Sequence, residues 1–150
     1  MRFIKPVYDI FSQLMRDEGW RTFPYDDKTG EPVKLASGGN VTIGYGFNIS
    51  ADGLPFMVAQ VWLQDNIREI QKALPSWTKE LDPARLGVLV NMAYNMGVPG
   101  LLGCRTFLTL VNQEKYAAAA QDMRDNILAY KQLPARYERL AQQMETGKWV

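Results

Sequence analysis

The stretch VTIGYGFNISADGLPFMVAQVW, residues 41–62, decides the fold because its hydrophobic pattern changes midway. Within residues 41–49, apolar residues alternate strictly with small or polar ones, a pattern that predicts a β-strand with one open face. That open face consists of Thr42, Gly44, Gly46 and Asn48. After Pro55, apolar residues recur every three or four positions, which predicts a long helix over 56–73 that Pro75 ends. The chain therefore changes from strand to helix here, and the segments on either side should belong to different lobes.

Turn-forming residues on the N-terminal side cluster at 26–32 and 37–40, which predicts short strands joined by tight turns. Before them, a helix is expected from about Lys5 to Asp17, and Gly19 should end it. On the C-terminal side, nearly the whole chain has helical periodicity. We expect helices over about 82–97, with Asp82 as N-cap, and over about 104–112, 115–129 and 134–145.

The predicted fold class is therefore α+β, a single domain of 150 residues that is pinched into two lobes. A small β lobe is expected over about 20–54, and a connecting helix over about 55–73. Residues of about 1–19 and 74–150 should form a larger helical lobe. Because ligands usually bind in clefts between lobes, we expect the functional site in such a cleft.

The composition excludes several kinds of site. The chain has no histidine and one cysteine, which excludes Ser-His-Asp triads, histidine-based metal sites and an internal disulfide. We therefore expect neither a metal nor a cofactor, and acid–base chemistry would have to come from carboxylates. Cys104 lies among apolar residues and is predicted to be a buried small hydrophobe. The net charge of +1 argues against a nucleic-acid partner.

Membrane and export segments are not expected either. No uncharged apolar run approaches the roughly 18 residues that a transmembrane helix needs, so we expect no stable membrane insertion. The first residues carry Arg2 and Lys5, and polar residues interrupt any signal-like apolar stretch. We therefore expect the chain to fold in the cytoplasm in which it is made.

Two carboxylates stand out as candidates for catalysis. Glu18 continues the apolar stripe of the first predicted helix, where low polarity would favour its protonated form. Asp27 lies in a turn rich in water and hydrogen-bond donors, which would keep it ionised. Such a contrasting pair is what glycoside hydrolysis needs, and the Thr42 hydroxyl could hold a water. On spacing alone the pattern is not decisive, because a glutamate at a helix end is more often solvated and Asp-Asp before glycine is usually a turn.

Three separated motifs add to this interpretation. Glu18-Gly19, Tyr25-Asp26-Asp27 and Thr42-Ile43-Gly44-Tyr45-Gly46 together resemble the active-site signature of phage lysozymes, glycoside hydrolase family 24. The similarity continues through Asn91-Met92-Ala93-Tyr94-Asn95-Met96-Gly97, Gly100-Leu101-Leu102-Gly103 and the closing Thr146-Gly147-Lys148-Trp149. It covers the chain from about Tyr8 to Trp149 and implies a lysozyme-like fold.

The resemblance also implies a reaction. Glu18 would be the general acid, Asp27 the second carboxylate that acts on an attacking water, and Thr42 the residue that positions this water. The family inverts the anomeric configuration, and its substrate is the β-1,4 bond between N-acetylmuramic acid and N-acetylglucosamine in peptidoglycan. The adjacent Asp26 is the alternative to Asp27.

Further roles follow from the same resemblance. Arg136 corresponds to an arginine that pairs with the catalytic glutamate, and Arg139 is expected to pair with Asp17. Both arginines could instead belong to a solvated helix face. The sugar-binding positions of the family correspond to Asn48, Tyr94, Phe107 and Asp122.

The chain departs from the family pattern in four places. Phe107 replaces a serine and Asp122 an asparagine, which puts the sugar contacts there in doubt. Phe47 stands where the family usually has histidine, so the family's histidine–aspartate ion pair cannot form. The loop over 31–40 is longer than in T-even-type members, which leaves the geometry between Asp27 and Thr42 open.

The function expected from the resemblance is that of an endolysin, a monomeric peptidoglycan hydrolase that lyses the host cell. Such an enzyme would wait in the bacterial cytoplasm until a pore-forming protein releases it to the cell wall. Two alternatives remain: a lytic transglycosylase, and a catalytically inactive module that binds peptidoglycan.

Overall fold

The computed structural model describes residues 7–26, 29–33, 35, 38–44 and 46–150. The chain divides into two compact units. We call Met1–Glu18 with Asn66–Val150 the helical unit, and Gly19–Asp65 the small unit. Each unit is described by itself below. The described residues are mostly helical and contain a two-stranded sheet, so the α+β prediction is confirmed at this level.

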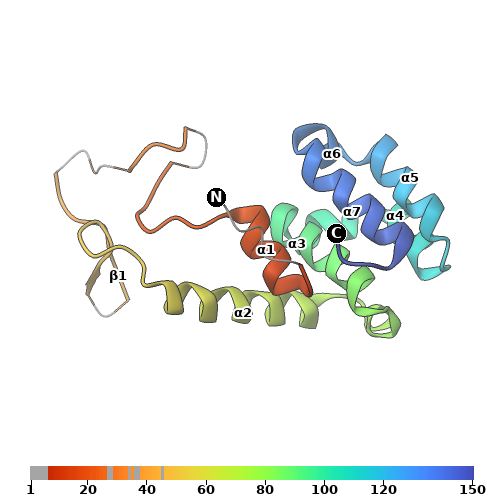
Figure 1. The fold of residues 1–150 in the computed structure, drawn as a ribbon, viewed down its shortest axis with the longest axis horizontal. Helices are drawn as coiled ribbons and strands as arrows, with labels where there is room; N and C mark the ends of the chain where they lie inside the picture. Colours follow the sequence, from red (N-terminus) through yellow and green to blue (C-terminus); the bar gives the residue numbers. More distant parts are fainter. Residues whose placement is uncertain (1–6, 27–28, 34, 36–37, 45) are drawn as a thin grey trace. The chain divides into compact units, whose positions relative to one another are not determined.

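The helical unit is built from helices, several of which pack against α3 or α7 (Figure 1). Its elements are α1 (Ile10–Glu18), the end of α2 (Phe56–Ala73), the 3₁₀ helix η1 (Ser76–Glu80), α3 (Pro83–Gly103), α4 (Arg105–Asn112), α5 (Tyr116–Asn126), α6 (Leu128–Gln132) and α7 (Pro134–Thr146). α7 contacts α3, α5 and α6, and α1 packs against α3. The core is therefore closed by helices from both ends of the chain.

The first helix is shorter than predicted. The expected start at Lys5 is outside the described residues, and residues 7–9 precede the helix. Ser12 N–H donates to Asp9 Oδ1 at 2.7 Å, while Ser12 Oγ accepts from Asp9 N–H at 3.2 Å. This reciprocal pair satisfies free N–H groups at the helix start, as a capping box does, and it fixes the beginning of α1 at Ile10.

The central helix α3 runs past the predicted end at Gly97. Gly97 has φ 78° and ψ 154°, so the helix is broken there, as expected, but it resumes and continues to Gly103. By length and apolar composition α3 could cross a membrane, contrary to our expectation that no segment would. The core helix of a globular protein has the same composition, and residues 87–93 are buried inside the helical unit.

The helix predicted over 115–129 is two helices. Ile127 separates α5 from α6, with φ −85° and ψ 117°, and its side chain is buried. The extended backbone turns Ile127 into the core while the next residue, Leu128, stays exposed. Burial of one apolar side chain therefore overrides the helix-forming residues around it.

An ion pair joins α5 to α7 at the surface. Arg124 donates from Nε and Nη2 to the two carboxylate oxygens of Glu138, each at 3.0 Å, and Tyr130 Oη donates to the same carboxylate at 3.0 Å. Chiefly through the hydrogen bond from Arg124, the pKa of Glu138 falls from 4.5 to about 2. A bidentate pair of this kind is stronger than an ordinary surface salt bridge.

We expect Glu138→Gln to lower the free energy of unfolding at pH 7 by about 1 kcal/mol, a value reduced for solvent screening because the carboxylate is partly exposed. The folded-state pKa is depressed, so the contribution is complete above 4.5 and disappears as the pH falls toward about 2. Urea unfolding at pH 7 and pH 3 measures this difference. Glu69→Gln, at an exposed pair with Lys72, is the control. If Glu138→Gln lowers the free energy of unfolding equally at both pH values, the lost stability does not come from the ionised carboxylate.

The small unit contains a hairpin where one strand was predicted. β1 (Thr42–Ile43) pairs antiparallel with β2 (Phe47–Asn48), Thr42 opposite Asn48, so the single strand over 41–49 is wrong. Gly44 and Gly46 have φ of 61° and 86°, left-handed values that glycine adopts without strain, and they reverse the chain. Of the four residues predicted to form an open strand face, the two glycines are therefore turn residues, and Thr42 and Asn48 lie opposite each other in the hairpin.

Two further contacts shape the small unit. A bridge between Tyr25 and Pro32 closes the turn that follows Tyr25. The amide of Leu54 donates to the carbonyl of Thr22 at 2.7 Å, and a Cβ on Gly53 would lie 2.7 Å from Thr22 Cγ2. Gly53 is thus required for the close approach of these two backbone segments.

Candidate functional site

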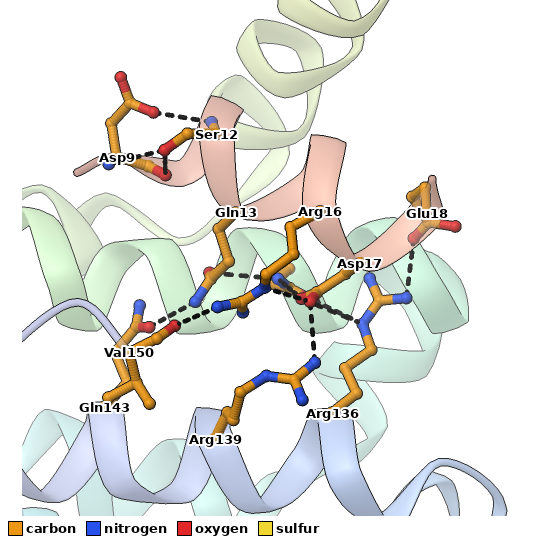
Figure 2. Close-up of polar contacts among 11 residues, drawn as sticks. Asp9, Ser12, Gln13, Arg16, Asp17, Glu18, Arg136, Arg139, Gln143 and Val150 are labelled. Atoms are coloured by element: carbon orange, nitrogen blue, oxygen red, sulfur yellow. Dashed lines mark hydrogen bonds and ion pairs between the residues drawn. The ribbon is translucent and has the colours of Figure 1, made fainter. Parts of the chain in front are cut away.

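The end of α1 carries the carboxylate predicted to be the acid. Glu18 is the last residue of the helix, and Gly19, with φ 71°, follows it. The predicted apolar surroundings of Glu18 are wrong, because 40% of its side chain is exposed. Its Oε1 contacts Arg136 Nη1 at 2.8 Å, so the arginine implied by the family resemblance is in place (Figure 2).

The buried carboxylate of α1 is Asp17, one residue earlier. Its side chain is 1% exposed, and Figure 2 shows guanidinium groups of α1 and α7 gathered around it. Arg16 Nε and Arg139 Nη2 each donate to Oδ1 at 3.0 Å, and Asn91 Nδ2 donates to Oδ2 at 3.0 Å. Burial alone would raise the pKa of Asp17, but the hydrogen bonds from Asn91, Arg16 and Arg139 outweigh it and lower this pKa. Asp17 therefore stays ionised and fixes the end of α1.

Arg136 connects these two carboxylates. Its side chain is 9% exposed near the start of α7, where Pro134 occupies the first turn. Nε donates to Asn91 Oδ1 at 2.9 Å, and Nε lies 3.8 Å from Asp17 Oδ2. The buried contacts of Nε therefore orient the guanidinium, and Nη1 contacts the exposed Glu18 carboxylate.

The candidates of the small unit lie on its turn and hairpin. Thr42 is exposed in β1, and Asn48 in β2 is half-buried, with its Oδ1 accepting from Ala51 N–H at 3.2 Å. Asp26 Oδ1 accepts from Thr29 N–H at 3.0 Å and thereby supports the turn. Asp27 lies outside the described residues. Its role as second carboxylate therefore stays a prediction, as does that of Thr42.

The other predicted sugar contacts belong to the helical unit. Tyr94 is half-buried in α3. Phe107 in α4 has no exposed surface, so it is a core residue here and is not placed to contact a sugar. Asp122 in α5 is half-buried and accepts from Asn126 Nδ2 at 2.7 Å.

A pocket of about 450 Å³ lies between the end of α3 and helices α4 to α6. Its lining includes Asp122 and Cys104, which is half-buried and not fully buried as predicted. Burial, followed by the charge of Asp122, raises the pKa of the Cys104 thiol. The thiol is therefore a poor nucleophile. In the part of the chain that the structure describes, no group of three or more metal-ligating side chains comes together.

Comparison with known proteins places the chain in a family. The family model described as phage lysozyme matches residues 15–141, which include Glu18, Thr42 and Arg136. A similar curated protein is the probable T4-type lysozyme 1 of Dictyostelium discoideum, 33% identical over 79 residues. That match covers 53% of this chain and 46% of the other protein, so the chain spans less than half the length of this relative. Because the family model matches most of its residues, the chain belongs to the phage lysozyme family.

Proposed function

We propose that this protein is a peptidoglycan hydrolase that cleaves the β-1,4 bond between N-acetylmuramic acid and N-acetylglucosamine. The observation that carries the proposal is the 2.8 Å contact between Glu18 and Arg136 at the end of α1, in a chain of the phage lysozyme family. A carboxyl group that is exposed yet held in one orientation can meet a glycosidic oxygen and give it a proton.

In the proposed reaction, Glu18 is the general acid. Arg136 binds Oε1, which leaves Oε2 as the oxygen to carry the proton. As the proton moves to the leaving sugar oxygen and the bond to C1 breaks, negative charge develops on Glu18. The neighbouring guanidinium stabilises that charge where it forms, in the manner of preorganised electrostatic catalysis.

The second half of the proposed reaction belongs to Asp27 and Thr42. The Thr42 hydroxyl orients a water, Asp27 accepts a proton from it, and the water oxygen bonds to C1 on the face opposite the leaving group. The configuration at C1 is thereby inverted. Asn48, Tyr94 and Asp122 are proposed as sugar contacts.

The proposed biological role is host lysis. The protein would act as a monomer, without a nucleic-acid partner or stable membrane insertion. It would remain in the bacterial cytoplasm until a pore-forming protein releases it to the cell wall. The role as endolysin rests on the family alone.

The test is mass spectrometry of purified peptidoglycan after digestion by the full chain. Hydrolysis adds water, so we expect fragments that end in reducing N-acetylmuramic acid. Fragments ending in anhydro sugars would replace the proposal with a lytic transglycosylase. The absence of fragments, with retention of the protein on the wall, would replace it with an inactive binding module.

A further inference from the structure

A chain of three buried amides leads from the core of the helical unit to Arg136. Gln143 on α7, Gln13 on α1 and Asn91 on α3 are all fully buried. Figure 2 shows Gln143 and Gln13 pointing toward each other, near Asp17 and the arginines around it. We call these three residues the amide chain. Each belongs to a different helix, so their hydrogen bonds join the helices whose packing sets the end of α1.

The direction of every hydrogen bond in the amide chain is determined by its two ends. At one end, the carbonyl of Ala84 can only accept, and it receives Gln143 Nε2 at 2.8 Å. Gln143 Oε1 then accepts from Gln13 Nε2, and Gln13 Oε1 accepts from Asn91 Nδ2 at 3.1 Å. At the other end, the Arg136 guanidinium can only donate, and Asn91 Oδ1 receives its Nε at 2.9 Å.

Reversal of any amide in this sequence would place two donors or two acceptors face to face. A buried mismatch of that kind is costly, because no water replaces the lost hydrogen bond. The Asn91 amide donates to two acceptors, Gln13 Oε1 and Asp17 Oδ2, and both hold its carbonyl oxygen toward Arg136. Gln13 therefore helps, together with Asp17, to fix the Asn91 orientation on which the Arg136 side chain depends.

We propose that Gln13 and Gln143 are positioning residues for the reaction, acting through Asn91 on Arg136 and so on the Glu18 carboxyl. Asn91 gives Arg136 its hydrogen bond from the core, while Asp17 lies 3.8 Å from the same Nε and Nη2 is buried without a hydrogen-bond partner among the described residues. With Nε fixed by Asn91, Nη1 can hold Glu18 Oε1 in one place. The inference rests on the proposed function, because it assigns a catalytic consequence to this geometry.

The experiment compares Gln13→Leu, Gln143→Leu and the double variant. Loss of Gln13 alone leaves Gln143 Oε1 without its donor, so this variant should unfold at a lower temperature than the double variant, which lacks both amides. Both lose Gln13 Oε1, one of the two acceptors of Asn91 Nδ2, and keep Asp17 Oδ2, so we expect the same fall in kcat, about fivefold, with KM for soluble peptidoglycan fragments unchanged. Gln143→Leu keeps Gln13 Oε1 as an acceptor for Asn91, so its kcat should fall less. Gln142→Leu, an exposed glutamine on the same helix, is the matched control.

The position of Arg136 is measured directly as the hydrogen-exchange rate of its Nε–H by NMR. We expect this rate to rise at least tenfold in Gln13→Leu and in the double variant. A kcat loss that follows thermal stability across the set, or an unchanged exchange rate, would overturn the proposal. The exchange measurement needs no substrate, so it tests the amide chain even if the wild-type protein proves not to cleave peptidoglycan.

Discussion

Glu18→Gln is expected to remove lytic activity while leaving the fold intact. The amide cannot supply the proton that the leaving sugar oxygen requires, and the loss of a positioned general acid lowers kcat by at least about 10²-fold. Folding should change little, because the side chain is partly exposed and an amide oxygen can still accept from Arg136. The measurement is the loss of turbidity of chloroform-treated Gram-negative cells, with circular dichroism to verify the fold.

The control for this prediction is Glu69→Gln, an exposed carboxylate of α2 paired only on the surface with Lys72, which should lyse cells at the wild-type rate. Full activity in Glu18→Gln would remove Glu18 from the mechanism. Asp27→Asn should also lose about 10²-fold, whereas Asp26→Asn should affect mainly the turn to which Asp26 contributes. If Asp26→Asn is the more damaging change, the assignment of the second carboxylate is wrong by one residue.

The sequence predicted the end of α1 as the centre of the site but not the environment of its side chains. The apolar stripe of the first predicted helix leads to Glu18, which is exposed. The buried side of α1 instead contains Gln13, Leu14 and Asp17. Hydrophobic periodicity cannot detect that side, because two of its members are polar and are satisfied only by residues far away in the sequence.

The partners of Gln13 show why. Asn91 is 78 residues away and Gln143 is 130 residues away, so no local pattern contains them. The one available signal was relational. Asp17 and Arg139 were expected to pair because Arg139 lies one helical turn after Arg136, and the structure has this contact. Because consecutive helix residues point about 100° apart, Glu18 points away from the buried side on which Asp17 lies.

The hairpin and the α5–α6 break show a different limit of sequence-based prediction. In both places the local sequence pattern is real, but the element predicted from it is wrong. Alternation with glycine at every second position fits an open strand, but Gly44 and Gly46 adopt left-handed backbone that a strand does not contain. At Ile127, the helix-forming residues on both sides predict continuity, and only the packing of its side chain in the core breaks it. The bounds of α2 were predicted well because its periodicity extends over several turns.

Asp17→Asn should strongly destabilise the helical unit. The substitution preserves the shape and one acceptor but removes the charge opposite Arg16 and Arg139, and Arg136 lies close by. Breaking a buried ion pair by removal of one partner costs about 3–5 kcal/mol when the remaining charge is fully desolvated. The cost here should lie at the lower end of that range, because the side chains of Arg16 and Arg139 are 28% and 35% exposed. Domains of this size are stable by only about 5–15 kcal/mol, so the variant should unfold at a much lower urea concentration. Asp125→Asn, at an exposed carboxylate of α5, is the control.

The pH dependence of this difference separates loss of charge from loss of packing. The pKa of Asp17 in the folded protein lies below its ordinary value of 3.8, so the stability that it contributes is complete above that value and is lost as the pH falls through the folded-state pKa. The difference in free energy of unfolding between wild type and Asp17→Asn should therefore be largest near neutral pH and should become smaller below about pH 4. If this difference in free energy of unfolding stays constant on acidification, the asparagine destabilises the protein through changed shape and hydrogen bonding and not through the lost charge. The charge of Asp17 would then not be needed to hold the three arginines at the end of α1.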